Sequence, residues 1–300
     1  LFQLGHEHEI DGDIFDMEFT PNRGDCLSLI GLARDLNIFF GKSENIDIFE
    51  DNIESLEINF ENNSPNDCPK ISFLEFEVKE TEYKYKPYLE RYFKLVGNNR
   101  TNLFSDISNY ISYELGQPTH CYDAELINGK LVFENKESNS SFKTLLGSEI
   151  KLDDHNCVFS INNEIVNLAG VMGGMSTACS PHSKRVLVEC AYFNPESVIG
   201  KSVKYNLISD AAYKFERGVD IELQEYVLRR FLKVASEHAN IKKAKIKTFI
   251  SRNLEEKFIE IDYKNINKIL GTQLEKDEYL SYLKKLSFDV KDKIKVLHSG

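Results

Sequence analysis

The sequence is poor in the features that mark membrane-spanning and disordered proteins. Its longest apolar stretch, residues 27–40, is interrupted by Arg34, Asp35 and Asn37, and it falls short of the ~20 apolar residues that a helix needs to cross a bilayer. Only 7 of the 300 residues are proline, while 41% are hydrophobic and 28% are charged. We therefore expect a folded protein outside the membrane, and its length predicts two or three domains.

Closely spaced cysteines are also absent. The six cysteines lie far apart, no two of them form a CxxC pair, and no signal peptide precedes them. Zinc ribbons, thioredoxin-like redox sites and disulfide-stabilised secreted domains are therefore excluded. We expect the protein to reside in the reducing cytoplasm. The six residues are Cys26, Cys68, Cys121, Cys157, Cys179 and Cys190.

Most of the chain has no excess of positively charged residues. The net charge is −11, which argues against a protein whose whole surface neutralises phosphate groups. Residues 241–300 nevertheless hold 14 Lys and Arg against 9 Asp and Glu, so this segment carries +5 and residues 1–240 carry −16. Any nucleic-acid contact that depends on charge alone is expected in the last sixty residues. The alternative is an ordinary, solvated, Lys-rich surface.

Hydrophobic periodicity predicts mixed secondary structure. Alternating residues predict strands at 13–19, 73–78, 92–96, 131–134, 156–161, 164–168, 185–191 and 258–262, and one more strand after residue 286. Helical spacing predicts helices at 26–40, 103–114, 221–239, 263–270 and 276–286. Gly271 is the expected stop after the fourth of these helices. Strands and helices mixed in this way are typical of an α+β fold.

The polar, Asn-rich stretch 41–69 has the composition of a linker around one short strand and predicts a domain boundary near residue 45. The chain begins at Leu1 within an apolar pattern and ends without a helix stop, so we interpret it as a piece of a longer protein. His6 and His8 with neighbouring acidic residues are a weak metal motif, because successive strand residues point to opposite faces. We predict no metal there.

Four sequence blocks follow one another along the chain. They are TPNRGDCLS (20–28) with GLAR (31–34); NY (109–110) with ELGQPTH (114–120) and Asp123; AGVMGG (169–174) with VECAYF (188–193); and DA (210–211) with FERGVD (215–220). In this order and at this spacing they are similar to the β subunit of bacterial phenylalanyl-tRNA synthetase. The resemblance extends over essentially the whole chain.

This resemblance implies a multidomain α+β architecture. Residues 1–45 correspond to the end of a first, B1-like domain, 46–245 to a mixed-sheet B3/B4 editing domain, and 250–300 to the start of a small α/β B5 module. In that family the α subunit activates phenylalanine with ATP and Mg²⁺, so the resemblance implies no cofactor in this chain, an α2β2 tetramer and tRNA(Phe) as partners. The B3/B4 domain hydrolyses tyrosine from mischarged tRNA(Phe).

The resemblance also implies a set of site residues. Glu189 matches the glutamate that recognises the tyrosyl hydroxyl, and Gly173 and Ala211 match small residues that leave room for the ring. His120, Asn109 and Ser209 match residues near the ester, where they orient water or the terminal ribose. Without the resemblance, Glu189 reads as an exposed strand residue, Gly173 as a tight turn and His120 as a satisfied histidine after a proline turn.

Two other functions stay open at this point. The chain could be a scaffold and tRNA-contacting module with a degenerate editing site, or a free-standing deacylase. The intact set of site residues favours the editing enzyme over the scaffold, and the flanking blocks disfavour the deacylase. The FERGVD block is expected to be structural, with Gly218 ending or kinking the backbone. Asn206 stands where similar sequences have glycine, and asparagine tolerates the left-handed backbone conformation.

Overall fold

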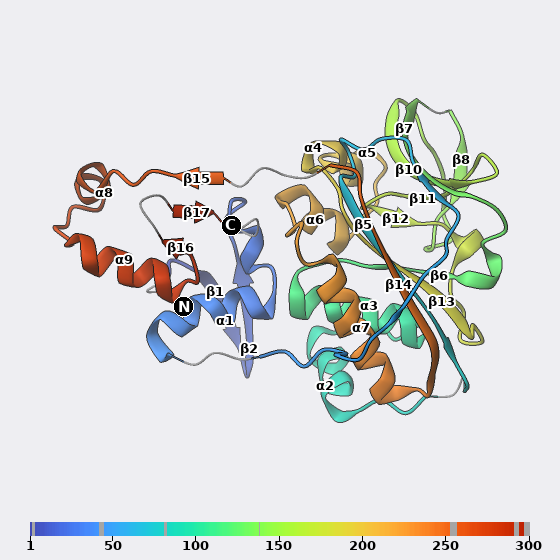
Figure 1. The fold of residues 1–300 in the computed structure, drawn as a ribbon, viewed down its shortest axis with the longest axis horizontal. Helices are drawn as coiled ribbons and strands as arrows, with labels where there is room; N and C mark the ends of the chain where they lie inside the picture. Colours follow the sequence, from blue (N-terminus) through green and yellow to red (C-terminus); the bar gives the residue numbers. More distant parts are fainter. Residues whose placement is uncertain are drawn as a thin grey trace.

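The computed structural model describes residues 1, 4–41, 45–80, 83–137, 139–252, 257–290 and 294–296. Figure 1 shows a larger lobe, which holds two five-stranded sheets, and a smaller lobe beside it. The smaller lobe contains the hairpin β1 (Glu7–Asp11) and β2 (Ile14–Glu18), and the helices α1 (Leu29–Phe40), α8 (Tyr263–Leu270) and α9 (Lys276–Lys285). Within the described ranges, no helix combines the length and apolar character needed to cross a membrane.

The central sheet of the larger lobe has the strand order β3-β14-β5-β13-β6. Only β3 is parallel to its neighbour β14 among these pairings. The strand bounds are Glu54–Ser55 for β3, Ile241–Ile250 for β14, Lys70–Val78 for β5, Arg185–Tyr192 for β13 and His120–Asp123 for β6. This sheet therefore joins segments from both ends of the lobe.

A second five-stranded sheet covers one face of the central sheet. Its strand order is β12-β11-β10-β7-β4, with β4 parallel to β7. The bounds are Met172–Gly173 for β12, Glu164–Leu168 for β11, His155–Ile161 for β10, Leu131–Glu137 for β7 and Phe60–Asn62 for β4. The three-stranded sheet β15-β17-β16 (Lys257–Ile259, Ile294–Val296, Asp289–Val290) and the hairpin β8-β9 (Ser141–Lys143, Glu149–Lys151) complete the strands of the described ranges.

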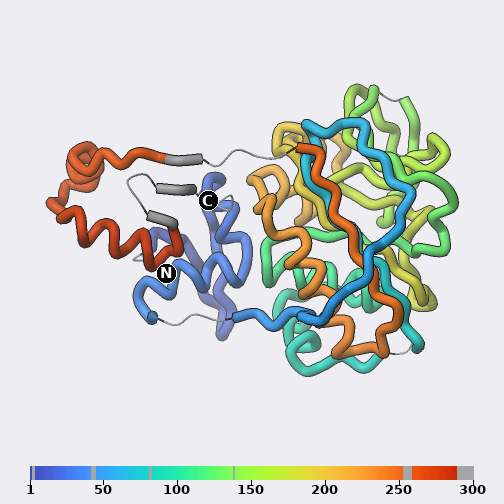
Figure 2. Tube along the Cα trace, in the orientation of Figure 1, coloured from blue at the N-terminus to red at the C-terminus, as the bar shows by residue number. Residues whose placement is uncertain are grey.

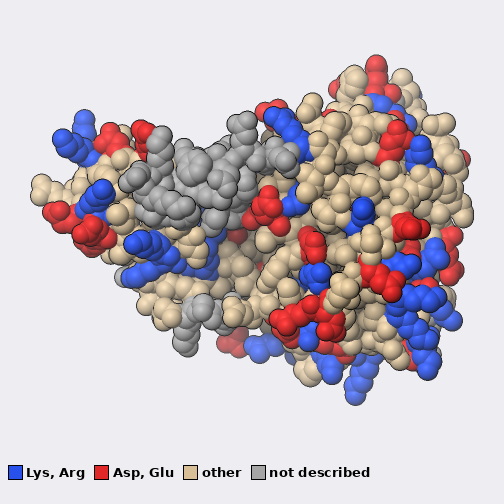
Figure 3. Space-filling model, viewed as in Figure 1, with Lys and Arg blue, Asp and Glu red and all other residues tan. Residues whose placement is uncertain are grey.

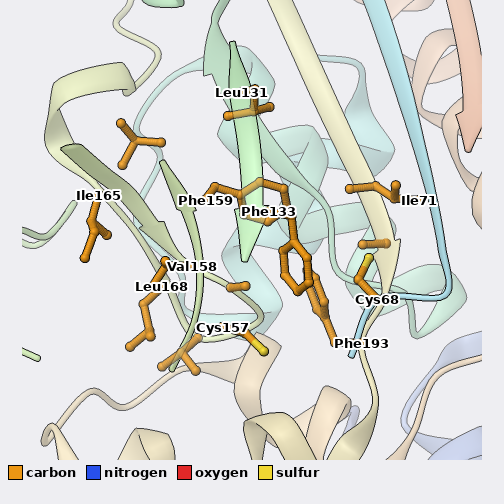
Figure 4. Close-up of a cluster of buried hydrophobic side chains, with 14 of the residues drawn as sticks. Cys68, Ile71, Leu131, Phe133, Cys157, Val158, Phe159, Ile165, Leu168 and Phe193 are labelled. Atoms are coloured by element: carbon orange, nitrogen blue, oxygen red, sulfur yellow. The ribbon is translucent and has the colours of Figure 1, made fainter. Parts of the chain in front are cut away.

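The main hydrophobic core lies between the two large sheets. Figure 4 shows part of it, where Ile71 of β5 faces Phe133 and Phe159 of the second sheet. The rings of Phe133 and Phe193 stack with their centroids 5.7 Å apart. Because strand residues alternate between faces, Leu187 and Ala191 of β13 join this core.

The opposite face of the central sheet is covered by helices. Even-numbered residues of β13, such as Val186 and Val188, pack with α3 (Leu103–Leu115) and α7 (Gln224–His238) in a second core. Both faces of β13 are therefore buried. The remaining helices are α2 (Pro87–Val96), α4 (Pro195–Val198), α5 (Lys201–Lys204) and α6 (Asp210–Arg217), with 3₁₀ turns η2 (Gly24–Cys26), η3 (Ala124–Leu126) and η4 (Met175–Thr177).

The sequence prediction of a strand at 92–96 was wrong, since these residues form the last half of α2. Pro87 lies at the first position of the helix, and Leu89, Tyr92 and Phe93 are buried at helical spacing. Gly97, with φ of 73°, ends the helix in the left-handed conformation. The short window 92–96 held too few apolar residues to distinguish a helix from a strand.

The Lys-rich segment 241–247 forms most of β14, which the sequence analysis did not predict as a strand. Lys242, Lys243 and Lys247 are exposed there, and Lys243 adopts a positive φ of 50° at a bulge in the pairing with β5. Lys245 and Ile246 of this segment pair in parallel with Glu54 and Ser55 of β3, and Figure 2 shows the two parts of the chain meeting. In Figure 3, positive and negative side chains are interspersed over the visible face of the larger lobe.

Most of the other expected elements are present. The α+β class is confirmed, and helices were predicted correctly at 103–114, 221–239, 263–270 and 276–286 to within a few residues. Gly271 ends α8 with φ of 65°, and Asn206 adopts the expected left-handed conformation with φ of 53°. Gly218 ends α6. The domain boundaries stay predictions.

Candidate functional site

A pocket of about 370 Å³ lies between α2, α3 and the first turns of α6. Three of the six site residues predicted from the sequence line it: Asn109, Ser209 and Ala211. The complete lining consists of Tyr92, Val96, Asn98, Asn99, Ser108, Asn109, Ser112, Tyr113, Pro118, Thr119, Ser209, Asp210, Ala211 and Lys214. The structure thus brings together residues that are a hundred positions apart in the sequence.

Local sequence signals position these pocket walls. Asn102 caps α3, with its side chain accepting a hydrogen bond from the Ser105 backbone, so Asn109 falls on the second turn of a well-defined helix. Ser209 caps α6, and its hydroxyl oxygen accepts a hydrogen bond of 3.3 Å from the Ala212 backbone N–H. The Ser209 proton remains available for donation into the pocket.

Glu189 and His120 lie opposite each other on neighbouring strands of the central sheet. Glu189 of β13 pairs in register with His120 of β6 on one side and with Phe73 of β5 on the other. The Glu189 side chain faces the second sheet, and the residue is only 4% exposed. The alternative of an exposed glutamate is thereby excluded, because a strand covered on both faces has no exposed side.

Burial shifts the protonation of both side chains. It raises the pKa of Glu189 from 4.5 to about 8, against a hydrogen bond from the Tyr122 hydroxyl that lowers it. It lowers the pKa of His120 from 6.5 to about 4. The Nε2 atom of His120 is buried and has no hydrogen-bond partner in the described part of the chain. At pH 7 this pair is therefore mostly a neutral carboxyl beside a neutral imidazole.

Gly173 lies directly against the His120 ring. A Cβ atom on Gly173 would be 2.2 Å from His120 Cε1 and 2.9 Å from Leu145 Cδ1. The φ angle of Gly173 is outside the left-handed region, so close approach rather than a tight turn requires glycine here. The space above Gly173, which the resemblance assigned to a substrate ring, is filled by His120 in this structure.

Tyr122 is a site residue that the sequence analysis missed. It is fully buried, its ring meets the His120 ring edge-on at 4.4 Å, and its hydroxyl accepts a 2.9 Å hydrogen bond from Asn167 of β11. The signal was available, since Tyr122 follows His120 by two residues and shares its strand face. Tyr122 and Asn167 link the central sheet to the second sheet beneath Glu189.

The six predicted residues thus fall into two groups of three. Asn109, Ser209 and Ala211 line the pocket, whereas Glu189, His120 and Gly173 meet between the sheets. The segment before β6 joins the groups, because Thr119 lines the pocket and directly precedes His120. The Ser108 hydroxyl, 2.7 Å from the Thr119 carbonyl oxygen, fixes this segment to α3.

A possible metal-ligand group lies in the smaller lobe, away from this pocket. Ligand atoms of His6, Cys26 and Asp35 are buried and lie within 4.8 Å of one another. The guanidinium of Arg23 already occupies the position between them, with Nη2 2.6 Å from Asp35 Oδ2 and 2.7 Å from Cys26 Sγ. This positive charge disfavours binding of a divalent cation. Arg23 also donates two hydrogen bonds of 3.0 Å to the Asp25 carboxylate. The group is therefore best understood as an ion-pair network.

Comparison with known proteins identifies a family for the larger lobe. The B3/4 domain family matches residues 80–240, more than half of the chain. Phenylalanine–tRNA ligase β subunits are similar over most of the chain. That of Fusobacterium nucleatum is 28% identical over 285 residues, covering 93% of this chain and 35% of the relative. That of Burkholderia lata is 30% identical over 282 residues, covering 92% and 34%.

One solved structure was also matched. An N-terminal fragment of the phenylalanyl-tRNA synthetase β subunit from Pyrococcus horikoshii is 13% identical, with a TM-score of 0.41. The match covers 96% of this chain and 83% of the fragment. The chain spans about a third of the length of the curated relatives it matches.

Proposed function

Because the chain belongs to the B3/4 domain family, we propose that it carries the editing site of a phenylalanine–tRNA ligase β subunit. In this proposal the site hydrolyses the ester of tyrosine wrongly attached to tRNA(Phe). The assembled enzyme, with an α subunit in an α2β2 tetramer, charges tRNA(Phe) with phenylalanine. ATP and Mg²⁺ serve that charging reaction, and this chain alone does not aminoacylate tRNA.

The observation that carries the proposal is the buried Glu189 carboxyl. A pocket shaped for phenylalanine cannot strongly reject a ring that only adds a hydroxyl, so a second site that reads the hydroxyl is required for accuracy. A buried carboxyl can exchange a hydrogen bond with a phenol. Phenylalanine at the same place leaves one hydrogen-bonding position of that carboxyl without a partner, at a cost of ~1–3 kcal/mol.

The raised pKa of Glu189 refines this recognition. At pH 7 the neutral carboxyl both donates and accepts, so it can pair with a phenol in either direction. Tyr122 already hydrogen-bonds to the carboxyl and is held in turn by Asn167. The carboxyl is thus oriented before a ligand arrives.

Hydrolysis at this site depends on positioning. A pKa of about 4 makes His120 a weak base at neutral pH, so its neutral ring is suited to orienting water or the ribose. Ser209 and Asn109 supply a hydroxyl and an amide to the pocket wall. A water molecule held between such groups is already positioned for attack on the ester. The translational and rotational entropy of that water is therefore lost on binding and not in the reaction step.

The test compares hydrolysis of tyrosyl-tRNA(Phe) and phenylalanyl-tRNA(Phe) by the full α/β enzyme. We expect wild type to release tyrosine selectively. Glu189→Ala should reduce that selectivity by about 10- to 100-fold, the equivalent of the unpaired-group cost. Glu125→Gln, which changes an exposed glutamate of η3, is the matched control and should leave both rates unchanged.

Gly173→Ala provides an independent arm, because the added methyl group must displace the His120 ring. We expect it to lower tyrosine release while charging of phenylalanine persists, which shows that the enzyme is still assembled. If wild type spares both substrates and still charges phenylalanine, the editing proposal is wrong. The chain would then act as a scaffold and tRNA-binding module.

A further inference from the structure

Lys214 is the one positively charged residue among those that line the pocket in the described part of the chain. It lies one helical turn after Asp210 on α6. Its Nζ donates to the carbonyl oxygen of Ser112 and lies 3.0 Å from the Ser112 hydroxyl. These two contacts use two of the three N–H donors of an ammonium group.

Burial at this position disfavours the charged form of Lys214. Burial lowers the pKa of Lys214 to about 8, while the nearby carboxylate of Asp210 raises it. Most of the lysine is therefore still protonated at pH 7. Asp210 is exposed, so solvent screens its charge, whereas Lys214 is partly buried and faces the pocket.

We propose that Lys214 binds a backbone phosphate of the RNA at the pocket, the phosphodiester that precedes the terminal nucleoside. This inference rests on the proposed function, since it takes an aminoacyl RNA as the ligand. Near the ester such a ligand carries a cationic amino group and anionic phosphates. Lys214 repels the first and attracts the second, so the charge selects the phosphate.

The surroundings of Lys214 favour an anion in the same place. The first turn of α6 contributes Ser209, Asp210 and Ala211 to the pocket wall, and the N-terminal end of a helix carries a partial positive charge. The side-chain amides of Asn98 and Asn99 in the pocket lining offer further hydrogen-bond donors. A phosphate bound there fixes how far the terminal nucleoside enters the pocket. Lys214 is thus a positioning residue for the ester.

The test uses two small substrates with the full-length subunit in its native assembly. Tyrosyl-adenosine lacks the phosphodiester, and the tyrosyl ester of the dinucleotide CpA contains it. We expect wild type to favour the CpA ester in kcat/KM by about 10- to 100-fold, the range of a hydrogen bond to a charged group. The ratio of the two values cancels effects on the ester itself.

Three variants separate charge from structure. Lys214→Gln keeps a donor for the Ser112 carbonyl and removes the charge, so we expect it to lower kcat/KM for the CpA ester far more than for tyrosyl-adenosine and thereby to abolish the preference for CpA. Lys214→Arg should retain much of the preference. Lys94→Gln, at an exposed position of α2, is the matched control and should behave as wild type. Hydrolysis of the CpA ester should depend less on salt concentration in Lys214→Gln than in wild type, because salt screens the attraction between the lysine and the phosphate.

The outcomes separate this inference from the proposed function. An equal loss on both substrates in Lys214→Gln means that the lysine acts at the ester or only holds α6 to α3, and it overturns the inference. If wild type hydrolyses neither substrate, the proposed function fails, and binding of unreactive CpA and adenosine decides the inference by calorimetry. A wild-type preference for CpA that Lys214→Gln loses supports it. Equal binding of the two ligands overturns it.

Discussion

Two buried clusters of ionisable side chains differ in how their charges are balanced. In the smaller lobe, which we call the paired cluster, Arg23 and Arg34 face Asp25 and Asp35, with His6 and Cys26 beside them. Between the sheets of the larger lobe, Glu189 lies opposite His120. Burial raises the pKa of Glu189 and the hydrogen bond from the Tyr122 hydroxyl lowers it, and no cation contributes to the shift. The first cluster is compensated within the fold. In the second, no cation balances the carboxyl, which burial keeps largely protonated at pH 7.

This difference separates buried polar groups that stabilise the fold from buried polar groups that are available to a ligand. A buried ion pair with both partners present holds the chain in one arrangement, and removing one partner is costly. A buried carboxyl without a cation destabilises the folded state, and such groups occur where a ligand uses them. The contacts between Arg23 and Asp25 accordingly hold the loop of the TPNRGDCLS block, whereas the Glu189 carboxyl has no compensating cation.

The largest effect that we predict is on the paired cluster. Asp35→Ala removes the acceptor for Arg23 at 2.6 Å and for His6 at 3.1 Å, leaving Arg23 without one of its two carboxylates. We expect the free energy of unfolding of the smaller lobe to fall by ~3–5 kcal/mol. Hydrogen exchange of the α1 amides measures this quantity locally.

The matched control is Asp47→Ala. Asp47 also forms an ion pair, 2.9 Å from Lys233, but its side chain is 66% exposed. An exposed pair contributes ~0–1 kcal/mol, so we expect little change. If the two substitutions destabilise equally, the paired cluster is not the compensated network described above.

The second prediction concerns the pH dependence that Glu189 imposes on stability. Between pH 6.5 and 8 the native state keeps a proton on Glu189 that the unfolded state, with a pKa near 4.5, has released. Stability contributed by the neutral carboxyl is therefore lost as the pH rises, at about 1.4 kcal/mol per pH unit and ~2 kcal/mol over this window. Glu189→Gln has no such proton and should lack this component. Urea titrations of both proteins at pH 6.5 and 8 measure the difference.

His120 explains why the window begins at pH 6.5. Its pKa is lowered to about 4 in the native state, so below pH 6.5 the unfolded state binds a proton that the native state does not. Stability from His120 therefore falls as the pH falls, opposite in sign to the Glu189 contribution, and the two slopes offset each other between pH 4.5 and 6.5. A constant difference between wild type and Glu189→Gln from pH 6.5 to 8 would contradict the raised pKa.

The sequence proposed six site residues, but it did not show what surrounds them. Glu189 was identified through its resemblance to the family motif, whereas its burial depends on the second sheet, whose strands lie 16–129 positions earlier in the sequence. Short apolar windows could not decide residues 92–96, and lysines concealed β14, whose partner strand β5 is more than 160 positions earlier. Periodicity reports one face of one element. It does not report which elements meet.

The smallest predicted effect compares two serine helix caps, one in each region. Ser28 accepts a 3.0 Å hydrogen bond from the Gly31 backbone at the start of α1, and Ser209 accepts one of 3.3 Å from Ala212 at the start of α6. Either Ser→Ala substitution should cost ~1 kcal/mol of stability, because a cap acceptor is lost.

Only Ser209 lines the pocket, so only Ser209→Ala should also slow release of tyrosine from tRNA(Phe). Denaturation and hydrolysis assays on both variants measure the two effects. Equal slowing in both would mean that helix stability, and not the Ser209 hydroxyl, limits the reaction, whereas slowing confined to Ser209→Ala assigns the hydroxyl to the substrate or its water.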